Sequence, residues 1–293
     1  MRGRLTAGLM PAAMLLNVVL AGCVSPDLPP GADGRLTDDW PPVAQATGYL
    51  PSVGRCLDTR PAEAGGSTGP AVTCDRIHYA EVAHVGAFPG DEKPGPEHLA
   101  AAYTECDTKA AAYLGRPWWE GRLELRLTLP GEAAWEGGAR WFRCDLIEVG
   151  IVDKDGHFIT RAGSLKDGFW EGLVVGCAEA PAAQGRRIDW MREVPCATAH
   201  NAEYAGFLRA ESGVPYPESD REWNALFRQC RDAVAPYIGI SRAQAAGLGV
   251  IAWPATEENW AAGDHRVRCA VWTGTKTLKK SVKGSKGKGI PAW

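Results

Sequence analysis

Two short motifs combine a cysteine, a histidine and a glutamate, the side-chain types that bind metals and transfer protons. Each has the spacing Cys-x-x-x-His-x-x-Glu, and the members are Cys74, His78 and Glu81 in one motif and Cys196, His200 and Glu203 in the other. Imidazole titrates near neutral pH and a carboxylate can orient it, so each His/Glu pair has the composition of an acid–base pair. Thiolate and imidazole are also usual zinc ligands. This chemistry would make the protein a hydrolase, with or without a metal.

We prefer a structural interpretation of both motifs. The His/Glu pair occurs unchanged in both, although one intact copy would suffice for an active site. No CxxC, HxxxH or HExxH motif and no glycine-rich phosphate loop accompanies it. We expect each histidine to bond the backbone or its own glutamate and so to fix the turn after the cysteine. The sequence thus predicts a protein that is not an enzyme, with no catalytic residue, metal or cofactor.

The eight cysteines that follow Cys23 form two sets with nearly the same spacing. The successive gaps are 18, 32 and 38 residues in the first set and 19, 34 and 39 residues in the second. An even number of cysteines is typical of disulfides in an exported protein. Each set allows three pairings, and we prefer the sequential one because its loops keep nearly constant length. The preferred pairs are Cys56–Cys74, Cys106–Cys144, Cys177–Cys196 and Cys230–Cys269.

Other residues repeat together with the cysteines. Tyr113 lies seven residues after the third cysteine of its set, as does Tyr237, and each begins a Tyr-Leu-Gly or Tyr-Ile-Gly triplet. Trp135 and Trp260 each precede the last cysteine of their set by nine residues. The chain therefore contains two copies of one domain of roughly 100 residues, a usual size for an independent fold.

Each copy has one strong helix signal, and the motif lies among strands. In the first copy, Pro96 suits a first helical turn, and Leu99, Tyr103, Cys106, Ala110 and Tyr113 follow at helical spacing. In the second copy, a capping box of Ser219 and Glu222 precedes Trp223, Leu226, Phe227, Cys230 and Val234. Strands are expected at 70–85, 123–129, 140–149 and 266–272. The predicted class is α+β, with one helix packed on a small antiparallel sheet in each copy.

The N-terminus has the features of a secretory signal. A basic start is followed by an apolar stretch from Leu5 to Leu20 and by Leu-Ala-Gly-Cys at 20–23. This ending resembles the lipobox of bacterial lipoproteins, which implies acylation (palmitate) of Cys23. We therefore predict a signal peptide at 1–22 and, because residues 23–48 are rich in Pro, Gly and Asp, a flexible tether there. The predicted location is the extracytoplasmic face of the cell membrane, held by lipid.

The rest of the chain divides by the repeat. We expect repeat 1 at 49–150, a connector with an Asp155-Gly156 turn at 151–171, repeat 2 at 172–275 and a flexible basic tail at 276–293. The tail holds six lysines and no acidic residue, so the net charge of −3 leaves −9 on the remainder. Such a tail could contact anionic lipid or acidic wall polymers, or could be a solvated terminus. Nucleic acid is excluded as a partner by the predicted location.

Tryptophan is abundant, with 12 residues. We expect Trp135, Trp223 and Trp260 to pack in the cores. Trp118 and Trp119 stand beside Pro117 in an expected loop, where they could either form a binding surface or pack inside.

The sequence resembles the septum formation domain of actinobacterial envelope proteins in two features. The first is the framework of the second copy, Val-Pro-Cys196 with His200 and Glu203, and the second is the Arg-Cys ending at Cys144 and Cys269. The first copy departs from it with Thr73 in place of the proline. The resemblance spans about 230 residues in tandem. It implies a place in the cell envelope and a link to septation. We therefore expect a non-enzymatic binding or scaffold module with envelope proteins or cell-wall polymers as partners; the alternative is an envelope hydrolase using the His/Glu pairs.

Overall fold

The computed structural model describes residues 50–59, 71–150, 158–166, 172–181, 188, 190–211 and 213–291. The predicted signal peptide, Cys23, the tether and the Asp155-Gly156 turn lie outside these residues. Residues 44–293 group into one unit by their internal contacts. Among the described residues, no helix combines the length and the apolar composition needed to cross a membrane.

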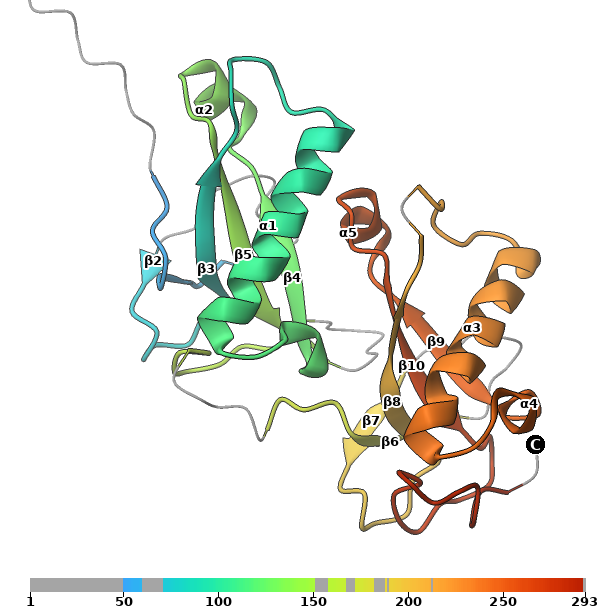
Figure 1. The fold of residues 1–293 in the computed structure, drawn as a ribbon. Coiled ribbons are helices and arrows are strands. Elements are labelled where there is room, and N and C mark those ends of the chain that lie inside the picture. Colours follow the sequence, from blue (N-terminus) through green and yellow to red (C-terminus); the bar gives the residue numbers. More distant parts are fainter. Residues whose placement is uncertain are drawn as a thin grey trace, which may run out of the picture. The chain divides into compact units, whose positions relative to one another are not determined.

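Repeat 1 is built on a five-stranded antiparallel sheet with the order β2-β1-β3-β5-β4. Strand β5 is almost entirely buried, and β3 is buried over its first four residues. Figure 1 shows helix α1 lying across one face of this sheet. The elements are β1 (Cys56–Leu57), β2 (Ala71–Val72), β3 (Ala80–Ala87), α1 (Pro96–Leu114), β4 (Leu123–Thr128) and β5 (Trp141–Glu148).

Repeat 2 has the same strand order, β7-β6-β8-β10-β9, again antiparallel, with α3 on one face (Figure 1). The two sheets even share an irregularity. Ala83 in β3 and Ala205 in β8 are each an extra residue in the pairing with the strand alongside, and each lies nine positions after its cysteine. The elements are β6 (Cys177–Glu179), β7 (Arg192–Val194), β8 (Ala202–Arg209), α3 (Asp220–Ile238), β9 (Val250–Pro254) and β10 (Arg266–Trp272). The α+β architecture in two small tandem domains is therefore confirmed.

The two long helices begin as the sequence predicts. Ser219 caps α3 through the expected capping box with Glu222. Both helices end at a glycine in the left-handed region, Gly115 at φ 72° and Gly239 at φ 82°, where a side chain would be strained. The described residues also contain four shorter helices: η2 (Trp118–Glu120), α2 (Glu132–Glu136), α4 (Arg242–Ala245) and α5 (Glu257–Ala261).

The eight cysteines form four disulfides, in the sequential pairing preferred from the spacing. They are Cys56–Cys74, Cys106–Cys144, Cys177–Cys196 and Cys230–Cys269. In each repeat, the second disulfide joins the long helix to the central strand within the hydrophobic core. Trp135 and Trp260 are buried in these cores, and Trp223 packs partly buried against the second, as expected.

The domain boundaries differ from those expected, because each repeat continues past its last strand. Residues 158–166, here called the connector loop, pack on repeat 1 and bury Leu165. Residues 276–291, here called the C-terminal loop, pack on repeat 2 and bury Leu278 and Val282. Residues 276–291 were predicted as a flexible tail, and this prediction is corrected. The lysine-rich composition favoured a solvated tail, although the segment also contains the two apolar side chains that reach the core.

Candidate functional site

The first His/Glu pair lies inside repeat 1, away from solvent. His78 is 1% exposed and Glu81 is fully buried. The ring of His78 donates from Nδ1 to the carbonyl oxygen of Arg76 at 2.7 Å, so it fixes the turn that follows Cys74. The backbone of His78 exchanges two hydrogen bonds with Arg161 of the connector loop, at 2.9 and 3.0 Å.

The second pair repeats this geometry in repeat 2. His200 is 2% exposed, and its Nδ1 donates to the carbonyl oxygen of Thr198 at 2.7 Å. Its backbone exchanges two hydrogen bonds with Leu278 of the C-terminal loop, at 3.1 and 2.7 Å. Its Nε2 lies 3.7 Å from Oε2 of Glu203, beyond hydrogen-bond distance. Both histidines therefore bond backbone, one of the two arrangements expected from the sequence.

Each buried glutamate holds the end of a loop to its domain. Glu81 accepts hydrogen bonds from the hydroxyl groups of Tyr113 and Ser164 and, at 2.6 Å, from the backbone N–H of Leu165. A carboxylate with three donors is well suited to burial, since its lone pairs are satisfied. The glutamate is therefore the residue that fastens the connector loop to repeat 1.

Glu203 binds the equivalent three donors in repeat 2. These are the hydroxyl groups of Tyr237 and Ser281 and the backbone N–H of Val282, the last at 2.8 Å. Burial, together with the hydrogen bond to Glu203, raises the pKa of Tyr237, so its hydroxyl stays a donor across the physiological range.

The sequence carried a signal for these loops that the cysteine spacing did not reveal. Ser164-Leu165-Lys166 and Ser281-Val282-Lys283 occupy the same positions, and in each the serine hydroxyl also accepts from the lysine N–H at 3.1 Å. The lysine ammonium groups lie over the rings of Tyr113 and Tyr237, at 5.6 and 5.9 Å from the centroids. A search for Ser-apolar-Lys after each repeat would have found both loops.

Two groups of potential metal ligands converge in the described part of the chain, one in each repeat. The first comprises Cys56, Cys74 and Glu81, and the second comprises Cys177, His200 and Glu203. Their cysteine sulfurs are bonded in disulfides and do not supply thiolates in this state. Their glutamates already bind three donors each, so the donor set does not match a zinc site, which uses free thiolate, imidazole or carboxylate ligands.

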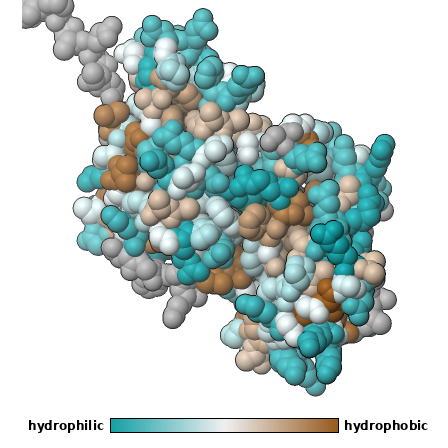
Figure 2. Space-filling model, viewed as in Figure 1, coloured by the Kyte–Doolittle hydropathy of each residue, from teal (hydrophilic) through white to brown (hydrophobic). Residues whose placement is uncertain are grey.

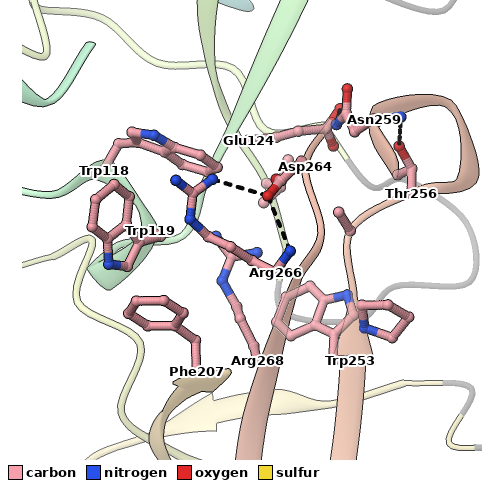
Figure 3. Close-up of a pocket in the computed structure, with 13 residues that line it drawn as sticks. Trp118, Trp119, Glu124, Phe207, Trp253, Thr256, Asn259, Asp264, Arg266 and Arg268 are labelled. Carbon is pink, nitrogen blue, oxygen red and sulfur yellow. Dashed lines mark hydrogen bonds and ion pairs between the residues drawn. The ribbon is translucent and has the colours of Figure 1, made fainter. Parts of the chain in front are cut away.

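Trp118 and Trp119 do not form an exposed binding surface. Trp118 is 2% exposed, and its indole N–H donates to Asp107 at 2.9 Å. Trp119 is half-buried against Phe207 of repeat 2, with ring centroids 5.6 Å apart. Of the two alternatives left open by the sequence, Trp118 therefore takes the packed one, and Trp119 lines a pocket with a volume of only about 30 Å³ (Figure 3).

Arg266 of β10 connects the two repeats and was not recognised from the sequence. Its guanidinium lies over the rings of Trp118 and Trp119, at 4.9 and 4.4 Å from the centroids, and pairs with Asp264 (Figure 3). It also pairs with Asp107 of α1. The arginine is 3% exposed. A buried charge of this kind requires paired partners, and here they come from both repeats.

Further polar contacts between the repeats are also buried. Asn259 donates to Glu124 at 3.1 Å, and Arg268 donates to the carbonyl oxygen of Leu123 at 2.7 Å. Burial lowers the pKa of Arg268. These contacts, like those of Arg266, favour the packing of the two repeats against each other.

A groove of about 780 Å³ lies where α1 of repeat 1 meets repeat 2. Its size is in the range of ligand sites in proteins. Thr104 and Ala100 line it from α1, and Tyr216 lies across from them with its ring 5.8 Å from that of Trp260. Three glutamates are also among its lining residues: Glu218, Glu222 and Glu257.

The comparisons with known proteins give one result. A family model described as septum formation matches residues 53–269, which include both repeats up to the last cysteine. No curated protein and no solved structure matches the chain.

Proposed function

Because the chain belongs to the septum formation family, we propose that it is an actinobacterial lipoprotein, attached through Cys23 to the extracytoplasmic face of the cell membrane. There it acts as a non-enzymatic binding module with a role in septation or cell-wall processes. The family match supports the link with septation. The four disulfides support export, since disulfides form and persist outside the reducing cytoplasm.

The groove between the repeats is the observation that carries the binding role. The His/Glu pairs, which have the right composition for chemistry, are buried and bonded to the ends of two loops. The groove is open and has the volume of a ligand site. Figure 2 shows hydrophobic residues in separate small patches among hydrophilic ones on the face in view, so that face offers no broad apolar surface for a partner.

The occupant we propose is a segment of another envelope protein. Apolar side chains such as Val214 and Pro215 line the groove together with the three glutamates, Arg209 and His265. Because the glutamates outnumber the one arginine, this lining suits a segment with both apolar and basic residues. Both repeats contribute to this lining, so a fixed arrangement of the repeats would preserve the site. Arg266 supplies that arrangement.

Photo-crosslinking in living cells tests the groove. A photoreactive amino acid at Thr104, which lines the groove, is compared with one at Lys109, an exposed residue of the same helix outside it. We expect a discrete protein adduct from position 104 and none from 109, with the partner identified by mass spectrometry. Equal adducts from both positions, or an adduct with cell-wall glycan in place of protein, would contradict the proposal.

Fractionation of the Cys23→Ala variant tests the anchor separately. Lipidation at a lipobox requires the cysteine thiol, so the variant should lack lipid and leave the membrane fraction. A variant that still carries lipid and sediments with the membrane would show that Cys23 is not the attachment site.

A further inference from the structure

All six lysines of the C-terminal loop are exposed, and the loop contains no acidic residue. The six are Lys276, Lys279, Lys280, Lys283, Lys286 and Lys288. Among the described residues, Lys279, Lys280 and Lys288 form no ion pair. The loop therefore presents uncompensated positive charge on a chain that otherwise carries −9.

The backbone of the loop follows a fixed path, so the lysines are not spread over a free terminus. Leu278 pairs with His200, and the N–H of Val282 bonds Glu203. The N–H groups of Gly284 and Lys286 then donate to the carbonyl oxygens of Tyr237 and Ile238 at the end of α3, both at 2.9 Å. These bonds fix the backbone of the loop on repeat 2 and satisfy carbonyls that a helix end leaves free.

The comparison with repeat 1 shows that the fold does not require this charge. Arg161 and Leu278 occupy the same position, and in both loops the serine that binds the buried glutamate follows three residues later. Between this position and the serine, the connector loop has Ala162 and Gly163, and the C-terminal loop has two consecutive lysines. The same fastening is thus made without lysine at these two positions.

We propose that the C-terminal loop is a docking surface for an anionic lipid membrane, which it contacts through lipid phosphate groups. Lysine ammonium groups act as point charges and need no shaped site, and lysines near an anionic membrane each contribute to binding. The proposal does not depend on acylation. If Cys23 is acylated, the loop would supply the second attachment that makes anchoring by few acyl chains stable.

Vesicle binding tests the proposal with the chain from residue 23 to 293, Cys23 replaced by serine and the disulfides intact. Vesicles of phosphatidylglycerol with phosphatidylcholine are compared with vesicles of phosphatidylcholine alone at about 0.1 M salt. We expect binding to the anionic vesicles only, and its loss at about 0.5 M salt because the charges are then screened. Equal binding to both kinds of vesicle, or none to either, would overturn the proposal.

A charge-matched pair of variants assigns the binding to the loop. Removing four lysines should weaken the partition onto anionic vesicles at least about 100-fold, since each contributes about fivefold near a charged surface. The same charge removed elsewhere should change it by less than about tenfold. The loop variant is Lys279→Gln, Lys280→Gln, Lys286→Gln and Lys288→Gln, and the control is Arg55→Gln, Lys109→Gln, Arg221→Gln and Arg228→Gln, all exposed in the wild type.

Two outcomes of this comparison would refute the docking surface. Equal loss in both variants would show an effect of net charge alone. Binding of the wild type to soluble polyphosphate but not to anionic vesicles would assign the lysines to a polymer. Thermal unfolding and a thiol count on each variant verify that the fold and the four disulfides are retained.

Discussion

Repeats 1 and 2 share one fold but use equivalent positions differently. The same position of the central strand, three residues before the cysteine, is Trp141 in β5 and Arg266 in β10, and both side chains are buried. The arginine reaches Asp107 of the other repeat, whereas the connector and C-terminal loops differ mainly in charge. Both copies therefore have the glutamate-bound loop, whereas Arg266 and the basic C-terminal loop are features of repeat 2.

Truncation after Thr275 tests whether the C-terminal loop is folded on repeat 2 or is a free tail, and it has the largest expected effect. Loss of the buried side chains of Leu278 and Val282 and of two donors to Glu203 should cost at least about 4 kcal/mol of unfolding free energy. Denaturant unfolding measures this, with removal of residues 290–293 as the control. If the Thr275 truncation is as stable as the full chain, the C-terminal loop is not part of repeat 2.

Replacement of Arg266 by methionine tests the contact between repeats. Two carboxylates, of Asp107 and Asp264, would lose a buried partner, which typically costs about 3–5 kcal/mol. Arg209 pairs with the same Asp107 but is half exposed, so Arg209→Met should cost at most about 1 kcal/mol. Similar losses in the two variants would mean that Arg266 contributes no more than a surface ion pair.

The two disulfides of repeat 1 close chain segments of different length, so their contributions to stability are expected to differ. On the chain-entropy model, the Cys106–Cys144 disulfide should contribute about 4 kcal/mol and the Cys56–Cys74 disulfide about 3 kcal/mol, because the first closes the longer loop. Double alanine variants, compared by thermal unfolding, measure both. More than one reactive thiol per chain in the unreduced wild type would contradict the four-disulfide structure.

Variants of the His/Glu pairs distinguish a structural role from a catalytic one. Alanine at His78 or at His200 removes a buried side chain and its hydrogen bond to the carbonyl oxygen of Arg76 or Thr198, and should cost roughly 1–3 kcal/mol in either repeat. Equal losses of unfolding free energy are expected because the geometry is the same. Unchanged stability in both variants, with loss of an envelope activity in only one, would support the hydrolase instead.

The smallest effect is expected where the two loops differ. Lys279→Ala with Lys280→Ala makes the C-terminal loop resemble the connector loop at two exposed positions, so the unfolding free energy should change by less than about 0.5 kcal/mol. A larger loss, measured under the same conditions as the truncation, would show that these lysines serve the fold as well as the surface.

The sequence by itself determined the features that depend on local spacing. The cysteine intervals revealed two copies and favoured the pairing that the structure shows, and the capping box at Ser219 placed the start of α3. The burial of His78 and His200 also followed, since a motif repeated beside a disulfide is better explained by structure. Each of these depends on residues close in the chain or on a pattern that occurs twice.

Only the tertiary structure decided which distant residues meet. The repeated Ser-apolar-Lys triplet marks Ser281 but does not show that it binds Glu203, 78 residues away, and the lysines around it favoured a free tail. The pairing of Arg266 with Asp107 and the groove beside α1 likewise depend on how the repeats pack. From the sequence alone, a charged side chain is expected to be exposed. Its burial becomes favourable only when folding brings a partner of opposite charge from elsewhere in the chain.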